Sequence, residues 1–384
     1  MITSLAISGY RSLREVTVSL SNLTIVSGGN GTGKSSLYRA LRLLADCAQG
    51  RVISSLAQEG GLMSTLWAGP ESFSRTMKSG EHPIQGIGRK KSISLKLGFG
   101  SDDYSYAIDL GLPTPSTSFF SQDPEIKSEH LWMGPISRPA NMLAKRNGPG
   151  VTIRSDDDGW QQVFNQLAST DSMMTHCSDP VRAAELLIAR EQMRDWRFYD
   201  HFRTDSMAPS RSAQTGTYTP VLSGDGHDLA AAIQTIREIG EHQQLESTIA
   251  DAFGGASVSV STSGGFTLEM IQHGLLRPLS ASELSDGTLR YLLLVAALLS
   301  PRPPKLMVLN EPETSLHPEL IAPLARLIAH ASKSTQMIVV SHSDKLVQHL
   351  SGQSEVVEIV LEKILGETIV QQNDAPTWHW PSSR

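Results

Sequence analysis

The residues best suited to chemistry lie between positions 28 and 35, which read Gly-Gly-Asn-Gly-Thr-Gly-Lys-Ser. They complete the pattern G-x-x-x-x-G-K-[ST], in which glycines let backbone N–H groups turn inward around phosphate oxygens. The lysine reaches the outer phosphates, and the serine hydroxyl can ligate magnesium. The sequence therefore predicts a site for a nucleoside triphosphate and Mg²⁺ formed by Gly28, Asn30, Gly31, Gly33, Lys34, Ser35 and Ser36.

Two elements must position this loop. The apolar run at 23–26 predicts a buried strand before it, and Leu37, Ala40, Leu41 and Leu44 follow it at helical spacing. This order places the phosphates at a helix N-terminus, where backbone N–H groups and the helix dipole attract anions. The context therefore supports the nucleotide prediction.

An acidic turn near the C-terminal end is the second candidate. Residues 306–309 read Leu-Met-Val-Leu and predict a buried strand, which Asn310 and Glu311 follow. In phosphate-loop enzymes such a strand delivers a carboxylate to the magnesium and a second carboxylate to the attacking water. Glu311 is the candidate for polarising the water. Taken alone, the segment also fits a core strand followed by a capped helix.

Two further patterns lie on either side of this turn. Leu284-Ser285-Asp286-Gly287 opens an apolar helix, and Ser341-His342-Ser343 follows the apolar run at 338–340. Ser285 and its helix N-terminus could offer hydrogen-bond donors to an outer phosphate, and His342 could contact it as well. In isolation, the first pattern would be a capped helix start and His342 an ordinary surface or core histidine.

The order of these four patterns resembles that of the ATP-binding cassette superfamily. The acidic turn Glu-Pro-Glu-Thr-Ser-Leu-His-Pro and the loop sequence look most like the SMC, RecF and OLD-type branch, and less like transporter cassettes. The motifs cover the first fifty residues and about the last hundred. The resemblance implies an α/β fold: an ABC-type phosphate-loop ATPase head with a mixed core sheet, an antiparallel β flank and a helical insert.

The resemblance also implies a head-to-head homodimer. Ser285 and Gly287 of one subunit would face the triphosphate held by Lys34 of the other, and Glu311, His342 and Lys34 would form the catalytic set. Two features depart from the family pattern. Asn310 stands where most relatives carry aspartate, which gives magnesium a neutral ligand. No glutamine can be assigned to the family's glutamine loop, although Gln58, Gln85 and Gln122 are candidates.

We expect three segments along the chain. Residues 1–155 would form an N-terminal lobe with the phosphate loop and a β flank, 156–240 a helical insert and connection, and 241–384 a C-terminal lobe. Alternation in 92–99 and 104–110 predicts an antiparallel hairpin. Helical spacing predicts helices between 160 and 197 and over 229–239.

The composition of the chain limits which partners, locations and covalent links are possible. The chain has 384 residues and a net charge of −6, which argues against wholesale wrapping of nucleic acid but leaves a local basic groove open. It has no apolar stretch of roughly twenty residues and no secretory signal pattern, so we expect no membrane partner and a cytoplasmic location. Cys47 and Cys177 fit buried side chains better than a disulfide or a metal site. The absence of a sustained heptad pattern excludes a long coiled-coil arm.

Several basic and aromatic residues remain ambiguous. Arg11 and Arg14 could touch phosphate or DNA, or lie in a solvated turn. Residues 196–203 could stack on nucleic acid, although a half-buried strand fits better. The basic run 89–91 is typical of a solvated face, and Trp378 and Trp380 could pack on the core or meet a partner.

The resemblance thus implies an ATPase that couples nucleotide to dimerisation and serves as a sensor or regulator in genome maintenance or anti-phage defence. Only about forty residues follow His342, so we expect any cutting or toxic activity in a separate effector, such as a nuclease or a toxin. The rival interpretation is a nucleotide-dependent clamp or scaffold that hydrolyses ATP slowly or not at all. A transporter's energising subunit and an adenylate-type kinase fit less well.

Overall fold

The computed structural model describes residues 1–72, 77, 94–114, 117–155, 159–352, 356–372 and 376–382. These residues form two compact units. Unit 1 contains residues 1–21, 26–195 and 359–384, and unit 2 contains residues 22–25 and 196–358. This division differs from the three consecutive segments that we expected, because strands β3 (Leu23–Gly28) and β16 (Val356–Ile364) each begin in unit 2 and end in unit 1.

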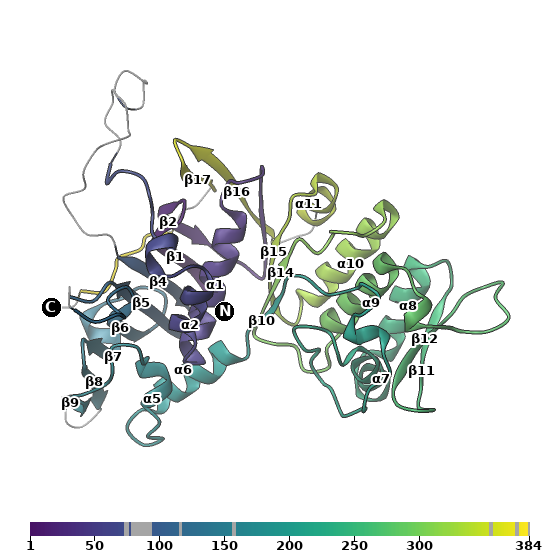
Figure 1. Cartoon of the computed structure of the whole chain (residues 1–384), viewed down its shortest axis with the longest axis horizontal. Coiled ribbons are helices and arrows are strands. Elements are labelled where there is room, and N and C mark those ends of the chain that lie inside the picture. The colour runs from purple at the N-terminus through teal and green to yellow at the C-terminus, as the bar shows by residue number, and fades with distance from the viewer. Residues whose placement is uncertain are drawn as a thin grey trace. The chain divides into compact units, whose positions relative to one another are not determined.

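Unit 1 is built on an eight-stranded antiparallel sheet, which we call the flank sheet (Figure 1). Its strand order is β2-β1-β4-β5-β6-β7-β8-β9, so most neighbours along the chain are neighbours in the sheet. The strands are β1 (Ile2–Tyr10), β2 (Leu13–Ser19), β4 (Leu95–Ser101), β5 (Tyr104–Gly111), β6 (Glu125–Met133), β7 (Met142–Asn147), β8 (Gly150–Ser155) and β9 (Gly159–Phe164).

Helices α1 (Lys34–Ala48), α2 (Val52–Gln58) and α6 (Ala184–Arg194) pack together against this sheet, near the short helices α3 (Leu62–Thr65) and α5 (Met173–His176). Their apolar faces are buried, as the period of the α1 sequence predicts. The buried ion pair of Glu129 with Arg146, 2.9 Å apart, lies below α5. Glu129 also accepts the backbone N–H of Met173, so this carboxylate fixes α5 to the flank sheet.

Unit 2 contains the parallel strands β10 (Arg197–Tyr199), β14 (Leu306–Asn310) and β15 (Gln336–Val340), with the first residues of β3 beside β15. Helices α9 (Asp286–Leu298) and α10 (Ile321–Ala331) belong to the same buried apolar cluster as these strands. The unit is completed by α7 (Leu229–Ile239), α8 (His242–Ala252), α11 (Asp344–Ser351) and a small sheet of β11 (Ser257–Ser261), β12 (Thr267–Ile271) and β13 (Leu279–Ser280).

Several local predictions are confirmed. The hairpin is formed by β4 and β5, which pair antiparallel, and the helix at 229–239 has the expected bounds. Residues 197–199 of the aromatic segment form strand β10, in which Phe198 is half-buried and Tyr199 is 2% exposed, as expected of a half-buried strand. Cys47 and Cys177 are buried and free.

One prediction is wrong. Residues 159–164 form strand β9 rather than the start of a helix, and β9 pairs with β8. The spacing of Val163, Phe164 and Leu167 suggested a helical face, but Trp160, Val163 and Phe164 are aromatic or β-branched residues that fit a strand. Pairing with β8 in a hairpin makes this segment a strand. The helices of this region are α5 and α6.

Some sequence features lie outside the described residues, namely the candidate Gln85, the basic run 89–91 and the start of the segment 92–99. The ordered tail at 376–382 packs on the flank sheet. Its Trp378 ring lies 5.7 Å from the Trp132 ring, and Trp380 donates to Glu15 across 3.1 Å. In the part of the chain that the structure describes, no helix is long and apolar enough to cross a membrane.

Candidate functional site

The phosphate loop follows β3 and ends at Gly33, the N-cap of α1. Gly28 has a φ of 144° and Gly33 a φ of 112°, which are conformations that other residues rarely adopt. A β-carbon at Gly28 would collide with the backbone oxygen of Leu361, and one at Gly33 with the hydroxyl of Thr368. Both positions therefore require glycine, and β16 and β17 (Glu367–Gln371) form the wall behind the loop.

The Lys34 side chain stabilises the conformation of the loop by hydrogen bonds to its backbone. Its ammonium group donates to the backbone oxygens of Gly28 at 2.6 Å and Gly29 at 2.9 Å, and the residue is only 6% exposed. Thr32 closes the same turn through its hydroxyl, 2.9 Å from the Gly29 oxygen. The Thr368 hydroxyl donates to the Thr32 oxygen at 2.7 Å. The loop is thus preorganised by contacts within unit 1.

The N-terminus of α1 differs from those of the other site helices. Within the described residues, α1 has no side-chain cap and no acidic residue in its first turn. In contrast, α9 and α11 are capped by Ser285 and Ser343 and carry an aspartate in the first turn. An uncapped N-terminus presents backbone N–H groups and a positive dipole end, which suits an anion. Asn30, Gly31 and Ser35 are exposed beside it, and Ser36 is half-buried.

The two arginines before the loop are engaged by carboxylates. Arg11 forms an ion pair with Glu59 at 2.6 Å, and Arg14 forms one with Glu367 at 2.8 Å. Glu59 also accepts the hydroxyl of Tyr10, whose pKa is raised mainly by burial. These contacts fix the turn between β1 and β2 to the rest of unit 1, so structural pairing accounts for both arginines.

In unit 2 the acidic turn begins where β14 ends. Asn310 is the last residue of the strand, and Glu311 follows with a φ of 49°. A left-handed backbone costs a residue other than glycine about 1–2 kcal/mol. Such strain is found most often at functional sites, where the surrounding structure maintains it. Here the Glu311 N–H donates to the Val340 oxygen of β15 at 2.7 Å.

Glu313 is the anchor of this turn. It is 7% exposed, and one of its carboxylate oxygens accepts from the Ser341 hydroxyl at 2.6 Å and from the N–H groups of His342 at 3.1 Å and Ser343 at 3.2 Å. The His342 Nδ1 lies 3.5 Å from Glu313 and 3.7 Å from Glu311. Unit 2 therefore brings the predicted Glu311 and His342 together, as the sequence interpretation requires.

The start of α9 packs against the same turn. Ser285 caps the helix by accepting the Thr288 N–H at 3.2 Å, and a β-carbon on Gly287 would lie only 2.9 Å from the Ser315 backbone oxygen. Arg211, whose side chain is 8% exposed, donates to the Leu284 oxygen and to the Asp286 carboxylate, each at 2.7 Å. Arg211 thus holds the loop that presents Ser285.

Sequence reasoning missed three residues of this half-site. Arg290 on α9 donates to the backbone oxygens of Asp200 at 3.4 Å and Glu311 at 3.3 Å, and it is 3% exposed. Burial lowers the pKa of its guanidinium. Asp200 accepts from the Asn310 amide at 2.7 Å. The third is Glu313. Asp200 and Arg290 lie in segments that contribute no recognisable motif at these positions, so no local signal could have identified them.

Each half of the predicted site is therefore described in its own unit. Gly28, Gly33, Lys34 and Ser35 belong to unit 1, whereas Ser285, Gly287, Asn310, Glu311 and His342 belong to unit 2.

Two family models match different parts of the chain. A family model described as "AAA ATPase domain" matches residues 1–170. A second, described as "AAA domain, putative AbiEii toxin, Type IV TA system", matches residues 158–348. Both models describe AAA-type ATPase domains, and together they cover residues 1–348. No curated protein matches the sequence.

Solved structures show the fold. An SMC head bound to the C-terminal winged-helix domain of ScpA is 13% identical over 97% of both chains, with a TM-score of 0.50. The SMC head domain from Thermotoga maritima is 15% identical and covers 97% of this chain and 99% of its own, with a TM-score of 0.48. An Smc head with an extended coiled coil from Pyrococcus furiosus, bound to the C-terminal domain of ScpA, is 12% identical over 97% and 96%, with a TM-score of 0.48. The likeness to the SMC head bound to ScpA confirms the predicted α/β fold.

The residues of this chain fit a nucleotide and a metal ion. In unit 1, the glycine turn and the uncapped α1 suit phosphates, and Lys34 and Ser35 follow in the expected order. In unit 2, the amide oxygen of Asn310 is buried and has no hydrogen-bond partner among the described residues. An amide oxygen without a partner suits a hard cation such as Mg²⁺. When bound, the ion would neutralise phosphate charge.

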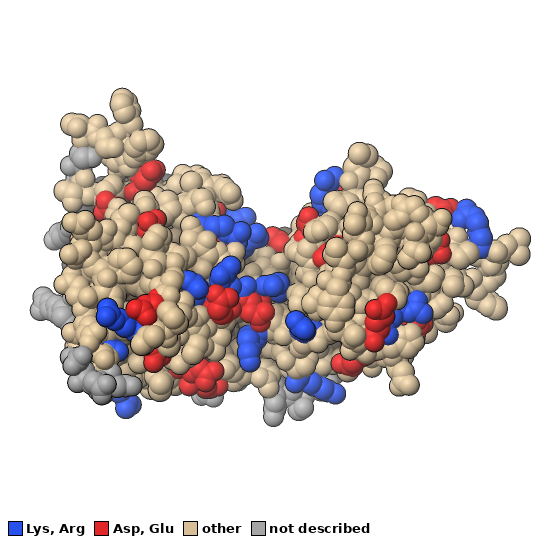
Figure 2. All heavy atoms as spheres, turned by 90° about the horizontal axis from the view of Figure 1, so that it is seen from below, with Lys and Arg blue, Asp and Glu red and all other residues tan. Residues whose placement is uncertain are grey.

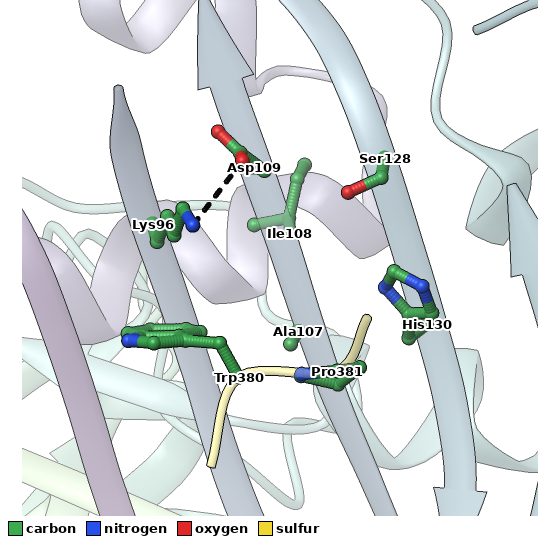
Figure 3. A pocket seen from close by; sticks show the side chains of 8 residues that line it. All are labelled: Lys96, Ala107, Ile108, Asp109, Ser128, His130, Trp380 and Pro381. Atoms are coloured by element: carbon green, nitrogen blue, oxygen red, sulfur yellow. Dashed lines mark ion pairs between the residues drawn. The ribbon is translucent and has the colours of Figure 1, made fainter. Parts of the chain in front are cut away.

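A separate cavity of about 40 Å³ lies between the flank sheet and the C-terminal tail (Figure 3). Lys96 and Asp109 form an ion pair across 3.7 Å on one side, and Trp380 and Pro381 cover the other. Burial lowers the pKa of His130 to about 4, so this ring is neutral near pH 7. The cavity has room for about one or two waters and is too small for a nucleotide.

Proposed function

We propose that this chain binds and hydrolyses ATP with Mg²⁺ and that ATP drives its dimerisation. The observation that carries the proposal is the phosphate loop of unit 1, where Gly28 and Gly33 adopt conformations that require glycine and lead into a helix without a side-chain cap. This geometry has no evident structural use other than binding an anion at the N-terminus of α1.

Each predicted residue has one role in the proposal. Lys34 and the loop bind the phosphates, and Ser35 with Asn310 holds Mg²⁺. Glu311 polarises the attacking water, and His342 contacts the outer phosphate. Ser285 and Gly287 of a second copy bind the same triphosphate through the N-terminus of α9. The strained backbone of Glu311 and the contacts of Glu313 with the His342 loop support these roles.

We further propose a role in defence or genome maintenance, in the cytoplasm, together with a separate effector. The description of the family model that matches residues 158–348 mentions a toxin of a type IV toxin–antitoxin system, which supports the defence setting. The effector would be a nuclease or a toxin carried by another chain, and the nucleotide state would control it.

Duplex DNA is part of the proposal because unit 1 carries a basic pocket of about 330 Å³. Arg51, Arg190 and Arg194 line it together with Thr175. Arg51 is paired with Asp46, and Arg190 and Arg194 share Glu191, so the pocket has more basic than acidic groups. Basic and acidic side chains are mixed over the face shown in Figure 2, so a local arginine pocket fits DNA phosphates better than a broad basic surface would. Replacing Arg190 and Arg194 with glutamate should then remove any stimulation of ATP turnover by DNA.

The deciding experiment is steady-state ATP hydrolysis by the full chain with Mg²⁺, with and without duplex DNA. We expect turnover that is lost in Lys34→Ala through failure of nucleotide binding. In Glu311→Gln we expect turnover to be lost while binding persists, and ATP should trap this variant as a dimer in light scattering. Turnover that survives in Glu311→Gln would refute the assigned role of the carboxylate.

The alternative function is a nucleotide-dependent clamp, and Asn310 is the observation that favours it. A neutral amide at this position offers Mg²⁺ less charge than aspartate and could slow hydrolysis. Affinity and turnover separate the two functions. Tight ATP binding and ATP-dependent dimers in the unmodified chain, without turnover in the presence of Mg²⁺ and DNA, would establish the clamp.

A further inference from the structure

Asn310 has an unusual neighbour for a residue at the end of the acidic strand. Its amide nitrogen donates to the carboxylate of Asp200 across 2.7 Å, and the two residues are 110 positions apart in sequence. The other end of the amide, Oδ1, is buried without a partner among the described residues. An amide that donates through nitrogen in this way has a fixed orientation and presents its oxygen as an acceptor.

Strand register explains why Asp200 lies there. Strands β10 and β14 are parallel, and Tyr199 pairs with Leu309, so Asp200 and Asn310 are the next residues at the same carboxyl edge. In parallel α/β sheets this edge is where ligands bind. Arg290 donates to the backbone oxygens of Asp200 and Glu311, which holds the two strand ends together. The pairing therefore follows from the fold of unit 2.

We propose that Asp200 is a positioning residue for the metal ion and supplies the negative charge that Asn310 lacks. Asp200 is exposed at the strand end, so its carboxylate can approach a ligand from solvent. Its hydrogen bond orients the Asn310 oxygen toward the cation, in the way that outer carboxylates orient metal ligands elsewhere. The pair together carries one negative charge, as a single aspartate at position 310 would. This inference rests on the proposed function.

The test measures metal binding rather than turnover. A fluorescent ATP analogue that cannot be hydrolysed is titrated into the full chain at increasing Mg²⁺, and Mn²⁺ binding is followed by electron paramagnetic resonance. Asp200→Asn should raise the Mg²⁺ or Mn²⁺ concentration for half-saturation by about 10–100-fold, because the negative charge is lost and the hydrogen bond to Asn310 becomes a weaker contact between two neutral amides. The affinity for the analogue without metal should stay unchanged.

A charge swap provides the second variant. Asp200→Asn combined with Asn310→Asp restores one amide and one carboxylate in contact, so metal affinity should return to within about threefold of the unmodified chain. Asp251→Asn is the matched control, since it removes another exposed carboxylate of unit 2, one that is paired with Arg326. This control should leave the metal dependence unchanged.

The outcomes separate the two levels of the proposal. Metal-dependent analogue binding in the unmodified chain, with the same dependence in Asp200→Asn or with no recovery in the swap, would overturn the role of Asp200 alone. If the unmodified chain binds neither the analogue nor the metal, the proposed function fails and the role of Asp200 fails with it. Loss in Asp200→Asn and recovery in the swap would establish the role.

Discussion

The phosphate loop of unit 1 presents mainly backbone, whereas the acidic turn of unit 2 presents side chains that are held by other side chains. In the loop, Gly28 and Gly33 make room for the chain, and Lys34 binds backbone oxygens within six residues of itself. In the turn, Glu313 is held by residues about thirty positions away, and Asn310 by one 110 positions away. One half-site is local, and the other is assembled from the whole unit.

This difference determines how each half can fail. A backbone cradle has little tolerance for added atoms, because the positions of its N–H groups follow directly from its dihedral angles. A network of side chains instead fails by losing a partner, which leaves buried polar groups unsatisfied. Substitutions that add a methyl group should therefore damage the loop most, and substitutions that remove an acceptor should damage the turn most.

The largest effect on this comparison should come from Gly28→Ala. The new β-carbon would meet the Leu361 oxygen and would occupy a φ of 144°, and we expect a cost of roughly 3 kcal/mol. ATP affinity should then fall by about 100-fold, measured by calorimetry. Gly31→Ala is the control in the same loop. A β-carbon added at position 31 would have no atom within 4 Å, and its cost should stay near roughly 1 kcal/mol.

If Gly28→Ala and Gly31→Ala lower ATP affinity equally, then the contact with Leu361 is not the cause of the loss. The phosphate loop would then be less rigid than its contacts indicate.

Glu313→Ala should have the next largest effect, and it addresses the side-chain network. Three donors, from Ser341, His342 and Ser343, would lose their buried acceptor, which should destabilise the chain by about 1–3 kcal/mol in denaturant unfolding. ATP turnover should fall with it because His342 is released, while ATP affinity should change little because the phosphate loop belongs to unit 1.

Glu319→Ala serves as the control, because the Glu319 side chain is 88% exposed and its closest ion-pair partner, His317, lies 3.6 Å away. A Glu313→Ala chain that is as stable as this control would mean that water replaces the carboxylate without cost, and the network would then have no structural role.

The same distinction explains what the sequence predicts. Gly28, Gly33 and Lys34 could be assigned because the loop's function depends on order within eight residues. Glu311 and His342 could be assigned because each follows an apolar strand. Asp200 and Arg290 could not, because their roles follow from the register of β10 with β14 and from the packing of α9. The β9 segment was misjudged for a related reason, since its hairpin partner outweighs its spacing.

The smallest effect should come from Thr368→Val, which tests how far the loop depends on contacts from outside residues 28–35. The Thr368 hydroxyl lies 2.7 Å from the Thr32 oxygen and 2.8 Å from the Ser12 hydroxyl, so strand β17 supports the loop by hydrogen bonding. Losing one buried hydrogen bond should cost about 1 kcal/mol, or roughly fivefold in ATP affinity by calorimetry. Thr152→Val in β8 makes the same chemical change in the flank sheet and should leave affinity unaltered. Unchanged affinity in Thr368→Val would mean that the loop keeps its shape without β17, and its function would then depend on residues 28–35 alone.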